Sequence, residues 1–167
     1  MNKASSNKTS TSIDLNCDMG EGIGNDAAIM PFISSANISC GYHAGDEKTI
    51  RETMELAARF KVSVGAHPSY ADKKNFGREE MDLSTAEIHE LITKQLILFN
   101  AIAIPAGISV KHVKPHGALY NKSAKDAKTA NAIAMAVKDF DPKLILFGLS
   151  GSHSIKEAKA IGLKTAS

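Results

Sequence analysis

Residues 35–46, SANISCGYHAGD, begin as a strand of alternating polar and apolar side chains and end in a histidine followed by a short turn. Side chains at alternate positions of a strand lie on the same face. Three more segments alternate in this way and end in an ionisable residue; they are DLNCD (14–18), SVGAH (63–67) and HVKPH (112–116). We therefore expect four strands, each with one polar and one apolar face.

The spacing of these segments indicates parallel strands. An antiparallel sheet with one solvated face alternates in the same way, but its neighbouring strands are usually joined by tight turns. Here the connecting segments are long enough to hold a helix, as parallel crossovers require. A parallel sheet is normally covered on both faces, so its polar face would line an enclosed lumen or crevice. Ionisable groups are costly there unless they bind something, so this face predicts an active site.

The alternation of strands and helices continues along the chain. Strands are predicted at about 13–18, 36–42, 62–67, 110–114, 144–149 and 163–165. Helices are predicted at about 26–33, 46–60, 84–103, 124–139 and 151–161, with Asp46 as a cap and Ser84 and Glu87 as a capping box. Five full units and part of a sixth, without a linker, predict one α/β domain over 13–167, as a barrel or an open parallel sheet. The right-handed crossover rule places all strand carboxyl ends on one side.

The composition is that of a globular domain. The chain has 167 residues, 43% of them hydrophobic, and a net charge of +2 from 20 basic and 18 acidic residues. Because no basic run occurs, nucleic acid and membranes are not expected as partners. Residues 1–12 are polar and are expected to form a disordered tail rather than a signal peptide or anchor. Cys17 and Cys40 fall on apolar strand faces, where reduced thiols are expected, and the predicted compartment is the cytoplasm.

Carboxylates and histidines follow the predicted strands in one polar register. Asp18 and Glu21 flank a sharp turn after the first strand, where a pair of acids suits proton transfer or a hard metal ion. A single strand-end histidine is more often a hydrogen-bonded core residue. However, His43, His67 and His116 end three different strands, and three coincidences are hard to attribute to packing. Metal binding and proton transfer therefore both remain open.

Lys114 and the absence of nucleotide motifs narrow the chemistry further. Lys114 would stabilise an oxyanion or bind a substrate carboxylate. Asp18 with two or three of the histidines suits Zn, Mn or Fe, although no local motif such as HExxH occurs. Neither a phosphate loop nor a nucleophile elbow is present in the sequence. The remaining ionisable candidates are expected to be supporting or exposed residues: Asp14, His112, His89 and His153.

Six blocks of sequence resemble the LamB/YcsF family, and they occur in order from residue 13 to the end of the chain. The blocks ANISCGYHAGD and VKPHGALYN are the most specific because they are long. The six are IDLNCDMGEG (13–22), SANISCGYHAGD (35–46), GAHPSY (65–70), NFGR (75–78), HVKPHGALYN (112–121) and LILFGLSGS (144–152).

The resemblance implies a TIM-like (β/α) barrel of the glycoside hydrolase/deacetylase type. The family includes the A subunit of the bacterial 5-oxoprolinase, which implies ATP-dependent opening of the lactam of 5-oxoproline to glutamate together with two partner subunits. The matching positions imply catalytic roles for Asp18, Glu21, His43, Lys114 and His116, and substrate contacts for Asn16, His67 and Asn121. A divalent metal is a further candidate cofactor, with Asp18, His43, His67 and His116 as its ligands. Because no phosphate loop is visible, ATP is expected to bind mainly on the partners.

Family members continue beyond the strand at 163–165, so the resemblance implies an incomplete barrel of about five to six strand–helix units. Exposed strand edges favour association, and a homo-oligomer is therefore open. Two other functions also remain open. One is a stand-alone metal-dependent amidohydrolase or deacetylase, and the other is a non-catalytic subunit that binds a small carboxylate ligand.

Overall fold

The computed structural model describes residues 13–167, so the tail predicted for residues 1–12 lies outside the described residues. Strands and helices alternate along the chain. The strands are β1 (Asn16–Met19), β2 (Ser35–Ser39), β3 (Ser63–His67), β4 (Val110–Val113), β5 (Ile145–Phe147) and β6 (Lys164–Ala166). The helices are α1 (Asp26–Ile29), the 3-10 turn η1 (Met30–Phe32), α2 (Glu47–Phe60), α3 (Thr85–Ala103), α4 (Gly117–Lys125), α5 (Ala127–Phe140) and α6 (His153–Ala160).

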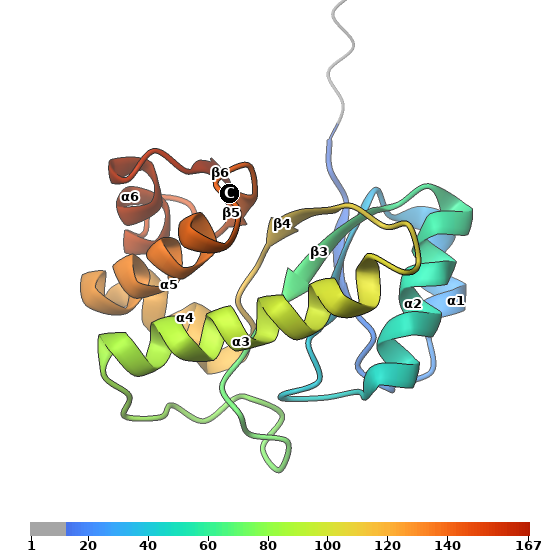
Figure 1. Ribbon diagram of the computed structural model, residues 1–167, viewed down its shortest axis with the longest axis horizontal. Helices are drawn as coiled ribbons and strands as arrows, with labels where there is room; N and C mark the ends of the chain where they lie inside the picture. Colours follow the sequence, from blue (N-terminus) through green and yellow to red (C-terminus); the bar gives the residue numbers. More distant parts are fainter. Residues whose placement is uncertain (1–12) are drawn as a thin grey trace, which may run out of the picture.

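All six strands form one parallel sheet in the order β1-β2-β3-β4-β5-β6. Helix α3 packs against α2 on one side and α5 on the other, and α5 packs against α6, so the helices follow the strand order around the sheet (Figure 1). The predicted α/β class with a TIM-like succession of units is confirmed. Within residues 13–167, β6 does not pair with β1, and the barrel is therefore open, as expected.

Capping residues start the helices where the sequence indicated. The Asp46 side chain accepts a hydrogen bond from the Thr49 amide, and Ser84 and Glu87 form the predicted capping box. The prediction of a turn between the fourth strand and residue 124 was wrong. Helix α4 occupies that segment, and it is too short to show a helical period in the sequence.

The hydrophobic core lies between the sheet and the helices. Strand residues Ile38, Val64 and Leu146 are buried there, and each such side chain contributes about 1.5–3 kcal/mol. The expected apolar face of the first strand forms only in part. Ile13 and Leu15 are exposed, because β1 begins at Asn16 and is an edge strand.

None of the helices in residues 13–167 combines the length and the apolar character needed to cross a bilayer.

Candidate active site

A polar layer crosses the first four strands of the sheet. In the strand register Asp18 lies beside Asn37, Asn37 beside Gly65, and Gly65 beside His112. Because Gly65 has no side chain, the His112 ring lies over this position of β3, and its Nε2 reaches Asn37 Oδ1 at 2.8 Å. Phe147 stacks on the ring, with 4.3 Å between the ring centroids. His112 is therefore a buried support for the site.

Asp18 is the centre of a charged network. Its Oδ1 accepts hydrogen bonds from Lys114 Nζ at 2.8 Å and from Asn37 Nδ2 at 2.7 Å, and its Oδ2 lies 3.4 Å from His67 Nε2. Asn16 exchanges amide hydrogen bonds with Asn37. Burial opposes ionisation, but hydrogen bonds and charges from His67 and Lys114 outweigh it and hold the pKa of Asp18 well below its usual range. Asp18 is therefore a carboxylate at neutral pH and a weak proton acceptor.

Three histidines pack together where β2, β3 and β4 end. The rings of His43 and His116 stack with centroids 3.9 Å apart, and His67 meets both edge-on. Their exposed fractions are 1% for His43, 1% for His67 and 7% for His116. Burial, followed by the neighbouring histidines, lowers the pKa of His116 to about 4. Burial also lowers the pKa of His43, although Glu21 opposes the shift, so both rings are neutral at neutral pH.

Each histidine has a fixed hydrogen-bond partner on its outer nitrogen. The pairs are His67 Nδ1 with the Lys114 carbonyl oxygen (2.6 Å), His116 Nε2 with the Phe76 carbonyl oxygen (2.9 Å) and His43 Nδ1 with Ser69 Oγ (2.9 Å). Phe76 has a φ of +56°, which is rare for a bulky residue. Its ring packs edge-on against His43 and His116, so the long loop after β3 supports the cluster from outside.

The loop after β1 brings Glu21 to the histidines. Its Oε1 lies 3.1 Å from His43 Nε2 and 3.6 Å from His116 Nδ1, and the side chain is 9% exposed. This position requires the loops after β1 and β2 to approach closely. Gly45 permits the approach, because its φ is +69° and a Cβ there would overlap the Gly20 carbonyl oxygen.

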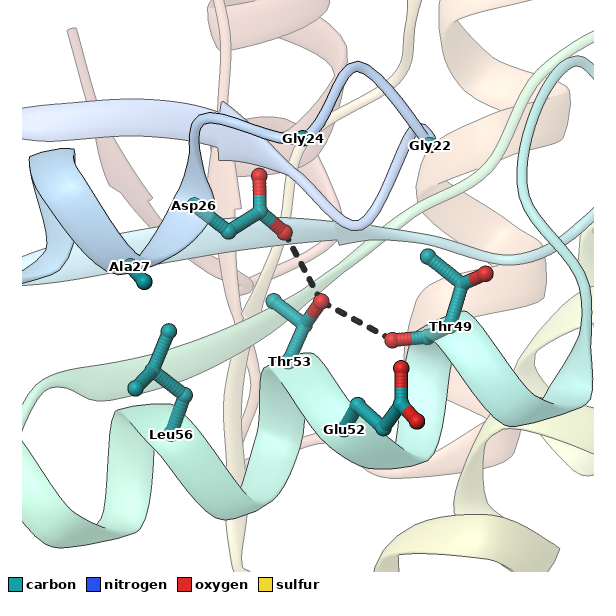
Figure 2. A pocket seen from close by; sticks show the side chains of 8 residues that line it. All are labelled: Gly22, Gly24, Asp26, Ala27, Thr49, Glu52, Thr53 and Leu56. Atoms are coloured by element: carbon teal, nitrogen blue, oxygen red, sulfur yellow. Dashed lines mark hydrogen bonds between the residues drawn. The ribbon is translucent and has the colours of Figure 1, made fainter.

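Asp26 anchors the other end of the Glu21 loop. Its Oδ2 accepts hydrogen bonds from the Gly20 amide at 2.9 Å and from the Thr53 hydroxyl on α2 at 2.8 Å (Figure 2). A hollow of about 350 Å³ lies here between the loop and α2. Among the described residues that line it, none is a site residue predicted from the sequence, so we do not assign the reaction to this hollow.

A second hollow, of about 360 Å³, adjoins the charged network. Asn16, Lys114, Tyr120 and residues of β5 and β6 line it. Because it touches both edge strands of the sheet, the sheet curves around it. Burial and then the charge of Asp18 raise the pKa of Tyr120, so its phenol is a neutral hydrogen-bonding group. This hollow is the better candidate substrate pocket.

The structure brings most of the predicted site residues together. Those in or beside the cluster are Asn16, Asp18, Glu21, His43, His67, Lys114 and His116. Asn121 instead lies on the exposed side of α4, away from the cluster. A metal-binding group is also present, since one ligand atom from each of four residues lies within 4.8 Å of the others. This group contains Glu21, His43, His67 and His116, whereas the sequence prediction named Asp18 in place of Glu21.

Sequence reasoning missed several residues that shape the site. They are Asn37, Ser69, Phe76 and Tyr120. Asn37 could have been found, because it shares the polar register of the strand before His43. The other three lie on a loop and a short helix, where no periodicity relates them to the strand ends.

Comparison with known proteins agrees with this geometry. The sequence profile of the LamB/YcsF family matches residues 13–167. The chain belongs to the LamB/YcsF family. Relatives in this family include proteins named as the A subunit of 5-oxoprolinase from Staphylococcus carnosus (strain TM300) and from Staphylococcus aureus (strain Newman). Each is 51% identical over 160 residues, which are 93% of this chain and 64% of the relative.

A solved structure in the same relationship is a lactam utilization protein from Thermus thermophilus. It is 43% identical, with a TM-score of 0.91, and the match covers 93% of this chain and 65% of that chain. The chain therefore spans slightly less than two thirds of the length of these LamB/YcsF relatives, and the expected family and fold are both confirmed.

Proposed function

We propose that this chain acts as the A subunit of a 5-oxoprolinase, hydrolysing the lactam of 5-oxo-L-proline to L-glutamate with two partner subunits and ATP. The Asp18–Lys114 pair, which lies between the histidine cluster and the second hollow, carries the proposal. The relatives' names suggest the reaction. The proposal places residues 13–167 in a single (β/α) domain and the protein in the cytoplasm, where its two free thiols would remain reduced.

The second hollow offers the groups that a small lactam acid needs. 5-Oxoproline carries a carboxylate and an amide carbonyl, and the Lys114 ammonium can pair with either. The Asn16 amide and the neutral Tyr120 hydroxyl line the same hollow and can hydrogen-bond to the lactam N–H and carbonyl. Lys114 is already oriented by Asp18, so little conformational freedom is lost when it engages the substrate.

Hydrolysis adds one water across the C–N bond of the lactam. The hydroxyl joins the carbonyl carbon, and the proton passes to the ring nitrogen as the bond breaks. Lys114 would stabilise the developing oxyanion. Because Asp18 is a weak proton acceptor, we assign proton transfer to Glu21 and the neutral histidines beside it. ATP would lower the barrier by activating the lactam, with the nucleotide bound mainly on the partners.

Reconstitution tests the function directly. When the chain is mixed with the two partner subunits, ATP and 5-oxoproline, we expect glutamate to form, and we expect omission of ATP or of any one protein to stop it. The Staphylococcus carnosus relative, used in place of the chain, serves as the positive control. No glutamate in a mixture that the control activates would reject the proposal. Turnover without ATP or partners would instead favour a metal-dependent amidohydrolase, and substrate binding without turnover would favour a non-catalytic role.

Lys114→Met tests the substrate contact. We expect the substitution to weaken 5-oxoproline binding about 10- to 100-fold, since a hydrogen bond to a charged group is lost. Calorimetry with the isolated chain and the KM of the reconstituted complex both measure this effect. Lys111→Met is the matched control, because Lys111 is exposed on the same strand and bonds only to nearby Ser109. Equal affinity of the two variants would contradict the assignment.

A further inference from the structure

Hydrogen-bond partners determine which nitrogens of His67 and His116 carry protons. A backbone carbonyl only accepts, so His67 Nδ1 must donate to the Lys114 carbonyl and His116 Nε2 to the Phe76 carbonyl. In the neutral rings the inner nitrogens, His67 Nε2 and His116 Nδ1, then carry only lone pairs. These two atoms nevertheless face each other at 2.9 Å. Nothing in the pair itself supplies a proton between them.

His43 shows the same arrangement. The Ser69 hydroxyl donates its one hydrogen to the Tyr70 carbonyl at 2.8 Å, so it accepts from His43 Nδ1. The remaining nitrogen, His43 Nε2, is therefore bare as well. It faces Glu21 Oε1 at 3.1 Å, and a carboxylate oxygen is also an acceptor. Four acceptor atoms thus converge in a buried site without a donor among them.

The spacing of these four atoms matches a small metal ion. Zn²⁺ binds imidazole nitrogen at about 2.0–2.1 Å, so ligand atoms of a tetrahedral site lie about 3.3 Å apart. The separations from Glu21 Oε1 are 3.1 Å to His43 Nε2 and 3.6 Å to His116 Nδ1, and that between the two inner nitrogens of His67 and His116 is 2.9 Å. The outer nitrogens all donate to fixed oxygen acceptors, as metal-bound histidines generally do.

We propose that Glu21, His43, His67 and His116 bind one divalent transition-metal ion of the zinc class. Three imidazoles and a carboxylate suit this class better than Mg²⁺ or Ca²⁺, which prefer oxygen ligands. The left-handed backbone of Phe76 aims a carbonyl at His116, and Ser69 orients His43, so the ligands are already positioned. An ion bound here would add a Lewis acid beside Asp18 and Lys114.

Protons are the competing source of positive charge. Two would be required, one between His67 and His116 and one between His43 and Glu21. Charging rings that touch at centroid distances of 3.9 and 4.8 Å, in a site that excludes water, is unfavourable. A single divalent ion interacts with all four acceptors at once.

Metal content tests the proposal without any enzymatic readout, so its failure is distinguishable from failure of the proposed function. The chain is stripped with EDTA, incubated with ZnCl₂, dialysed and analysed by elemental mass spectrometry, and affinity is measured against a chromophoric chelator. We expect about one equivalent of zinc, and with Co²⁺ the absorption bands of a four-coordinate site. His89→Gln removes a histidine outside the cluster, where it pairs with Asp139, and should bind as the unmodified chain does.

Two variants localise the site. Glu21→Gln should weaken zinc binding at least about 100-fold, because it removes a charged ligand while keeping its shape. Ser69→Ala removes only the support of His43 and should weaken binding about 10-fold, so it provides a milder test if Glu21→Gln does not fold. Only traces of zinc in folded, unmodified chain, as judged by circular dichroism, would overturn the proposal. Unchanged affinity in either folded variant would overturn it too.

Discussion

Asp18→Asn is expected to lower kcat of the reconstituted complex at least about 100-fold. The side chain keeps its size, but the charge that orients the Lys114 ammonium is lost, and so is the anionic partner of His67. Both groups then face the substrate without the field that positions them. Because the loss concerns stabilisation of charge in the transition state, kcat should fall more than KM rises. Steady-state rates of glutamate formation measure the effect.

The matched control for this charge removal is Asp82→Asn. Asp82 is exposed in the loop between β3 and α3, and its substitution removes the same charge without touching the network. We expect it to leave turnover unchanged. An Asp18→Asn complex that turns over like the Asp82→Asn complex would show that the carboxylate is not part of the reaction.

Gly65→Ala is expected to destabilise the chain by about 3 kcal/mol, which is the upper end of overpacking effects. A Cβ at this position would overlap the His112 ring. The ring is not free to move away, since it is 2% exposed, stacked on Phe147 and hydrogen-bonded to Asn37. Denaturant unfolding followed by circular dichroism gives the free energy of unfolding.

A double-mutant cycle identifies the cause of this loss. His112→Ala creates space, so the Gly65→Ala/His112→Ala protein should be more stable than the sum of the single changes predicts, by about 2 kcal/mol. Gly151→Ala is the control for backbone strain alone. Its φ is +74° and no atom lies within 4 Å of the added Cβ, so we expect a loss of only about 1 kcal/mol. Additive single changes at Gly65 and His112 would show that the two positions do not share the space.

The strand-end pattern illustrates how far local sequence reaches. Alternation places side chains at i and i+2 on one face regardless of the rest of the fold, so Asp18, His67 and Lys114 could be assigned to a common surface. Caps are equally local, and the Asp46 and Ser84 helix starts were predicted correctly for that reason. Helix α4 was missed because a nine-residue helix after a strand has too few turns to show a period.

Glu21 and Asn121 show where local patterns stop. Both lie outside strands, so no periodicity states where their side chains point. Contact between the loops at Gly20 and Gly45 brings Glu21 to His43, whereas Asn121 falls on the exposed side of α4. The metal prediction named Asp18 for the same reason, because a strand position can be read from the sequence and a loop position cannot.

The sequence by itself determined the parallel α/β order, the polar register and the family, since these depend on spacing along the chain. Only the tertiary structure decided which histidine nitrogens carry protons and which acceptors face one another. Those features depend on groups far apart in sequence, such as the Phe76 carbonyl and His116, whose positions are set by packing of the whole sheet and its loops. The register therefore located the site, and long-range contacts determined the chemistry available to it.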